Sequence, residues 1–144
     1  MKILVPLLLL AFLPGLSVAK EVSPLSTRCL SSDASKKAIK LQFSAVGDDA
    51  TGWSGAFVKY GKNGKPITLV VQKTSSEELI AGRPAEFTTI WLEVVGDQIT
   101  GTYEVATQGA LINNFVYKNK RTGATMSFSE SRDVELSDDG SCKW

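Results

Sequence analysis

The sequence predicts an all-β domain, an antiparallel meander of about seven to eight short strands that closes into a small β-barrel in preference to a sandwich. Three observations predict it. Apolar and polar residues alternate with a period of two, turn-forming residues separate these segments at intervals of about ten residues, and at most one short helix interrupts them. One cysteine near each end of the domain adds one expected disulfide.

The first three strands are expected at residues 39–45, 53–60 and 67–72. Ile39, Leu41 and Phe43 would share one face of the first strand, with polar residues between them. The Asn63-Gly64 pair predicts a tight hairpin between the second strand and the third. Residues 74–86 are the helix-like interruption, expected as a turn or a single short helix. Further strands are expected at 87–95, 98–106, 110–117 and 124–131, with 132–136 continuing or pairing separately.

Residues 1–19 have the pattern of an export signal that is cleaved after Ala19. Lys2 precedes an apolar run at 3–13, and the small residues Ser17 and Ala19 precede the expected cleavage point. A transmembrane anchor is disfavoured because the bilayer core needs about 20 apolar residues. The mature protein is therefore expected to be periplasmic or secreted, with no membrane span. Residues 20–36 are expected to be an irregular N-terminal segment, and 37–144 a single β domain.

Charge and residue content exclude several classes of function. Lys2 is the only charged residue in 1–19, so its loss leaves equal numbers of basic and acidic groups and no global field for binding nucleic acid. The sequence contains no histidine, which removes Ser-His-Asp and Cys-His catalysis and histidine-ligated zinc. The protein is therefore expected not to be an enzyme, and neither a cofactor nor a metal is expected.

Cys29 and Cys142 are expected to form one disulfide. The alternatives are a metal site, which would need more ligands, and a catalytic thiol. The acidic pairs Asp48-Asp49 and Asp138-Asp139 are expected to be solvated loop charges, since neither has the EF-hand spacing for calcium.

Two sets of residues are candidates for binding. The basic residues of two hairpins would form a local rim for an acidic protein partner or glycan, or would simply be solubilising charges; they are Lys59, Lys62, Lys65, Lys118, Lys120 and Arg121. Polar residues beside aromatics within strands would line a ligand cavity, unless they form an exposed sheet face; they are Trp91, Thr100, Thr102, Tyr103, Glu104 and Asn113.

The stretch from Ile99 to Glu104 resembles a short strand sequence found in the avidin family of eight-stranded barrels. The resemblance covers only these few residues. It implies a ligand-carrying barrel, but the series of pocket tryptophans of that family has no counterpart here, since only Trp53, Trp91 and Trp144 occur. No ligand residue is carried over from it.

The leading hypothesis is an exported, non-enzymatic binding module that acts on a protein partner in the manner of a periplasmic inhibitor or immunity protein. The first alternative is a calycin- or avidin-like barrel that carries a small ligand. The second is a carboxylate-based glycan hydrolase that uses Glu93 or Glu104. The oligomeric state does not follow from the sequence.

Overall fold

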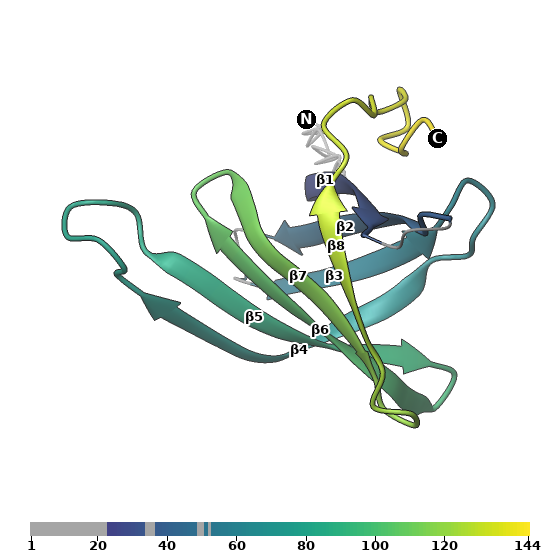
Figure 1. The fold of residues 1–144 in the computed structure, drawn as a ribbon, viewed down its shortest axis with the longest axis horizontal. Helices are drawn as coiled ribbons and strands as arrows, with labels where there is room; N and C mark the ends of the chain where they lie inside the picture. Colours follow the sequence, from purple (N-terminus) through teal and green to yellow (C-terminus); the bar gives the residue numbers. More distant parts are fainter. Residues whose placement is uncertain (1–22, 34–36, 49–50, 52) are drawn as a thin grey trace, which may run out of the picture.

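The computed structural model describes residues 23–33, 37–48, 51 and 53–144, and it shows one closed antiparallel barrel (Figure 1). Eight strands follow one another around the barrel in chain order, and the last strand pairs with the first. The all-β barrel prediction is confirmed. The strands are β1 (Ser23–Ser32), β2 (Lys40–Asp48), β3 (Trp53–Tyr60), β4 (Ile67–Glu77), β5 (Glu86–Val95), β6 (Gln98–Gln108), β7 (Leu111–Asn119) and β8 (Thr125–Glu130).

Two segments differ from their sequence-based expectation. Much of the stretch expected to be irregular forms β1, which pairs with β2 along its length and places Leu30 in the core. The 74–86 stretch contains no helix: β4 continues to Glu77, and β5 begins at Glu86. Pairing with β5 decides this, because Thr74 lies opposite Thr89 and their hydroxyls are 3.3 Å apart. The predicted export signal, residues 1–19, lies outside the described residues.

Large side chains fill the interior of the barrel. Phe115 is the centre of an aromatic cluster, with ring centroids 5.4 Å from Phe43, 5.8 Å from Tyr103 and 6.0 Å from Phe128. Trp91 packs edge-on against Phe43. Edge-to-face contacts of this kind suit the aromatic quadrupole and add to the burial of apolar area. The remaining buried core residues are Leu30, Leu41, Ala56, Val58, Leu69 and Val105.

The meander topology sorts the hairpins between the two ends of the barrel. Odd-numbered strands all run in one direction, so the β3–β4, β5–β6 and β7–β8 turns lie at one end and the β4–β5 and β6–β7 turns at the other. At this second end the β4–β5 hairpin projects far beyond the barrel, and the β6–β7 hairpin projects beside it (Figure 1).

Strand pairing is short at three seams of the barrel, those between β1 and β8, between β3 and β4, and between β7 and β8. β3 pairs with β4 only from Ala56 to Val58, and β7 pairs with β8 only from Val116 to Lys118. Among the described residues, 70–77 of β4 and 111–115 of β7 therefore have a strand partner on one side only. Their other edges present backbone N–H and C=O groups that a further strand could pair.

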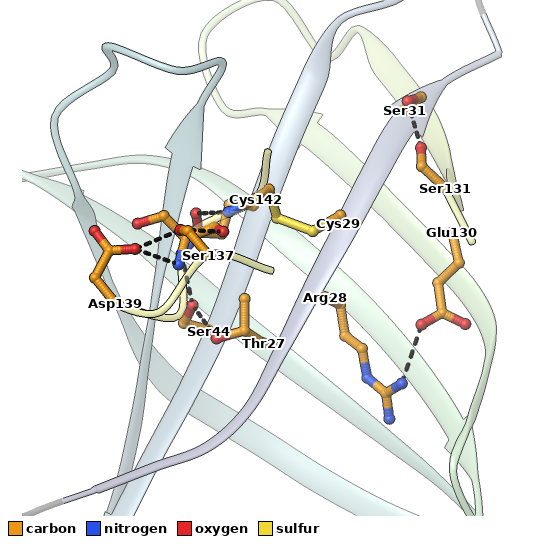
Figure 2. The surroundings of a disulfide bond; sticks show 12 residues. Thr27, Arg28, Cys29, Ser31, Ser44, Glu130, Ser131, Ser137, Asp139 and Cys142 are labelled. Carbon is orange, nitrogen blue, oxygen red and sulfur yellow. Dashed lines mark hydrogen bonds and ion pairs between the residues drawn. A yellow bond between two sulfur atoms is a disulfide. The ribbon is translucent and has the colours of Figure 1, made fainter. Parts of the chain in front are cut away.

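The chain after β8 crosses the outside of β1 and β2, and the disulfide fastens it there (Figure 2). The Cys142 N–H donates to Gln42 Oε1 at 3.1 Å, while the amide of Gln42 donates to Ser44 Oγ. These outward-facing side chains of β2 are almost fully buried by the segment. In the part of the chain that the structure describes, no helix is long and apolar enough to cross a membrane.

Candidate functional site

A groove runs between β7 and β8 where their pairing stops. One part, about 350 Å³ in volume, lies between the β6–β7 turn and the chain that follows β8; the adjoining part, about 310 Å³, lies between β7 and β8 themselves. Both parts are lined by Glu130 and Arg132. On the unpaired edge of β7, residues 111–114 line the groove.

Arg28 of β1 holds one end of this groove. Its Nη1 donates to Glu130 Oε1 at 3.2 Å, and its Nη2 donates to the carbonyl oxygen of Ala110 at 2.9 Å. The guanidinium thereby links β1 and β8 to the β6–β7 turn, and Figure 2 shows it reaching toward Glu130. Because both side chains are partly solvated, the ion pair itself contributes at most about 1 kcal/mol to stability. Its main effect is to fix the geometry of the turn.

The groove combines apolar and cationic surface. Leu111, Val134 and Leu136 line the first part, and Leu111 keeps 54% of its surface exposed. Arg132 is exposed and belongs to none of the ion pairs among the described residues. An open strand edge, apolar side chains and a free guanidinium are the features that bind an extended peptide as an added strand.

The described residues offer no group of three or more acidic or cysteine side chains that could hold a metal ion. The strongest polar cluster is instead inside the barrel, around Glu93 of β5. Glu93 is only 5% exposed, and its carboxylate accepts hydrogen bonds from Thr100 at 2.7 Å, Tyr103 at 2.8 Å and Tyr117 at 3.1 Å. The Tyr60 hydroxyl lies 2.6 Å from the Tyr103 hydroxyl. The cluster therefore includes all three tyrosines of the chain.

The direction of each hydrogen bond in this cluster follows from the carboxylate. Tyr103 donates its proton to Glu93, so the Tyr60 hydroxyl must donate to Tyr103. Asn119 Nδ2 in turn donates to the Tyr117 hydroxyl at 3.3 Å. Gly101 makes room for this arrangement, since a Cβ there would lie 2.6 Å from the Tyr117 hydroxyl oxygen. The cluster supplies a buried carboxylate with neutral hydrogen-bond donors. It closes the end of the interior that lies toward the β5–β6 and β7–β8 turns.

Burial raises the pKa of all three tyrosines. It is the largest cause for Tyr60, whose pKa rises to about 12 although the bond to Tyr103 lowers it. Burial followed by the proximity of Tyr60 raises the pKa of Tyr103, and burial followed by the charge of Glu93 raises that of Tyr117. In each case the tyrosinate is disfavoured because it would be desolvated close to a carboxylate.

We expect these shifts to make the protein unfold at alkaline pH. Tyrosine in an unfolded chain titrates near pH 10, so the folded state binds more protons above that pH. The tyrosines' contribution to stability should be complete below pH 10 and lost as the pH rises toward 12 and beyond. Absorbance at 295 nm and circular dichroism, followed together, should show tyrosinate appearing with loss of structure. Titration of all three tyrosines near pH 10 in a protein with native circular dichroism would contradict this.

The predicted ligand-binding residues do not meet in one cavity. Trp91 and Tyr103 point into the packed core, and Thr100 is a donor in the Glu93 cluster. Thr102 and Glu104 alternate with Tyr103 on β6 and face outward, where exposed Glu104 accepts a hydrogen bond from Asn114. Asn113 is exposed, donates to Glu86 Oε2 at 2.7 Å and lines the β7–β8 groove. Of the two candidate catalytic carboxylates, Glu93 is thus enclosed and Glu104 is on the outer face.

The predicted basic residues belong to two hairpins at the same end of the barrel. Lys59 and Lys62 line a hollow of about 340 Å³ with the C-terminal segment. Lys59 helps to lower the pKa of Asp139, after the larger effect of hydrogen bonds from Ser137 and Ser141. Lys65, Lys118, Lys120 and Arg121 are exposed on the second half of the β3–β4 turn, on β7 and in the β7–β8 turn.

Sequence reasoning found Asn113 but missed the other residues that make the groove. Arg28 is 102 positions from Glu130 in the chain, and it meets Glu130 and Arg132 only because β8 pairs with β1. No sequence signal pointed to Arg28, because it lies in the stretch 20–36 that was expected to be irregular.

The Cys29–Cys142 disulfide prediction is confirmed, with the sulfurs bonded and the Cα atoms 5.8 Å apart. A buried disulfide of this kind fits a protein of the periplasm or of the extracellular space, where the environment is oxidising. Comparisons of the chain with protein-family models, with curated proteins and with solved structures find no match. The groove and its chemistry are therefore the basis for a functional assignment.

Proposed function

We propose that the protein is an exported, non-enzymatic binding module that takes an extended segment of a partner protein into the groove between β7 and β8. One observation carries the proposal. The edge of β7 from residue 111 to 115 has no strand on its outer side among the described residues, and a groove of about 350 Å³ adjoined by one of about 310 Å³ lies beside it. An incoming strand would gain backbone hydrogen bonds from this edge.

The lining suggests which segment would fit. Side chains of an added strand alternate, so every second one would face the apolar surface of Leu111 and Leu136. An acidic residue near one end would pair with Arg132. Arg28 is already engaged by Glu130 and Ala110 and supports the wall of the groove. The proposed ligand is therefore an extended stretch that alternates apolar residues and carries a carboxylate.

The disulfide and the pattern of residues 1–19 support a periplasmic or secreted location, in which cleavage follows Ala19. Within the class of binding modules we favour an inhibitor or immunity-type role, in which the partner is a hydrolase of the same compartment. The small disulfide-fastened barrel and the absence of histidine support this role. Inhibition of the captured enzyme by added purified protein is the measurement for this part of the proposal.

The groove is tested by capture of a stoichiometric partner from the envelope or extracellular fraction of the source cells, followed by amide hydrogen exchange on the purified complex. We expect the partner to protect the amides of residues 111–115. We expect Leu111→Glu combined with Arg132→Glu to weaken binding by about tenfold or more, because the charge reversal opposes the acidic residue and the glutamate disrupts the apolar lining.

Two control variants locate the contact. Val95→Glu changes an exposed apolar residue at the opposite end of the barrel and should leave binding unchanged. Lys120→Glu with Arg121→Glu tests the basic hairpin region as the alternative contact. Loss of binding only in this last variant, or full binding by the groove variant, would refute the groove proposal.

A further inference from the structure

The free edge of β4 differs from that of β7 in its surroundings. Residues 70–77 are all exposed, and the β4–β5 hairpin that carries them projects away from the barrel (Figure 1). Among the described residues, this edge is paired to β5 alone. The β7 edge is recessed beside β8 and has room for one segment, whereas the β4 edge is open to a whole second sheet.

Natural proteins protect long exposed edges with prolines, charges or bulges, because such edges associate. Residues 70–77 contain no proline and a single lysine, Lys73. A bulge at Gln72 interrupts the ladder between Val71 and Lys73, and from Lys73 onward the pairing with β5 is regular to Glu77. The regular stretch of the edge is therefore the five residues from Lys73 to Glu77.

Charge along this stretch is unbalanced within one chain. Glu77 lies directly opposite Glu86 on β5, and like charges in this position destabilise a sheet. Neither Glu77, Glu86 nor Lys73 belongs to an ion pair among the described residues. Lys73 lies on the same outer face as Glu77 because both pair with outward positions of β5. A cation is missing beside Glu77, and an anion is missing beside Lys73.

We propose that two copies of this chain associate through their β4 edges, antiparallel, about a two-fold axis at Ser75. A two-fold contact requires that each residue meet its counterpart in both directions. In this register Lys73 of each copy lies opposite Glu77 of the other, and Thr74 lies opposite Ser76. The continuous sheet places a lysine beside each Glu77–Glu86 pair and offsets its repulsion.

Exposed apolar residues flank this stretch at both ends. Val71, 37% exposed, precedes the bulge, and Leu79, 51% exposed, follows the end of β4. A shift by two residues in either direction would put Lys73 opposite Ser75 or Leu79 and leave both charges unpaired. The inference goes beyond the proposed partner binding, because it uses a different edge and holds whether or not a partner occupies the β7–β8 groove.

Sedimentation velocity of the purified chain, at concentrations of about 10–500 μM suited to a small interface, tests the proposal. We expect a concentration-dependent dimer. Lys73→Glu or Glu77→Lys alone should raise the dissociation constant by about tenfold, because each creates two like-charged pairs. The double variant, with both substitutions, should restore the dimer. Lys118→Glu, an equal charge change on β7, should have no effect.

Cross-linking reads the register directly. Opposed residues of antiparallel strands have Cα atoms about 4.5–5.5 Å apart, a distance that a disulfide spans. Ser75→Cys should therefore give a disulfide-linked dimer under mild oxidation, while Gln98→Cys at the opposite end of the barrel should not. A monomer at all concentrations would overturn the proposal. A dimer that Lys73→Glu leaves intact, or that Ser75→Cys does not cross-link, would overturn it as well.

Discussion

Replacement of both Cys29 and Cys142 by serine is expected to lower the free energy of unfolding by about 2–5 kcal/mol. The disulfide joins residues separated by 113 positions, so it restricts nearly the whole unfolded chain. It also lies beside the seam that closes the barrel, where β1 and β8 pair only from Leu30 to Ser32. Urea unfolding of the wild type and the double variant gives the difference directly.

The loss should be local as well as global. Without the disulfide, the C-terminal segment keeps the bond from Cys142 N–H to Gln42 and a few polar contacts, and its release would expose the buried side chains of Gln42 and Ser44. Hydrogen exchange should therefore increase first in residues 131–144 and at the end of β1. Reduction of the wild type should reproduce the variant. Equal stability of the two proteins would show that the β1–β8 seam holds without the disulfide.

Glu93→Ala is expected to lower the free energy of unfolding by about 3–4 kcal/mol. This is the second of the two largest effects that we expect. The substitution removes the acceptor of three hydroxyl groups inside the barrel and leaves a cavity beside Tyr103, which is completely buried. A buried polar group without a partner costs about 1–3 kcal/mol. Since small domains are stable by only about 5–15 kcal/mol, the variant should be close to unfolding at moderate denaturant.

Two variants separate the hydrogen bonds from the packing. Glu93→Gln keeps one acceptor oxygen and nearly the same volume, so we expect a smaller loss than with alanine. Glu104→Ala removes a carboxylate that is exposed on the next strand and should change stability by less than about 1 kcal/mol. If Glu93→Ala and Glu104→Ala cost the same, the buried cluster would contribute nothing specific.

Much of the strand order followed from local patterns. Alternation and turn residues placed β2, β3 and β5 to β8 within a few residues of their positions, because side chains on a half-buried sheet repeat with a period of two. The pattern was weakest where strands carry polar residues on both faces. Residues 74–86 resemble a turn or a short helix in sequence, and only pairing with β5 makes residues 74–77 part of a strand.

The candidate site was less accessible to such reasoning. The groove between β7 and β8 depends on where their pairing stops. The sequence of residues 111–115 does not indicate that β8 diverges from them. The Glu93 cluster likewise gathers residues from four strands. The sequence places each residue of the cluster on one face of its own strand. The shear of the closed barrel then decides which of these residues come together.

The sequence by itself determined the alternating strands, the turns, the fold class of a barrel with about eight strands, and the pairing of the two cysteines. These features depend on neighbours along the chain or on the number of cysteines. Only the tertiary structure decided which strand edges remain open, that the interior is filled by aromatic rings around Phe115, and that Glu93 is enclosed by hydroxyl donors. These features arise from register between strands distant in sequence, and register is set by the closure of the whole sheet.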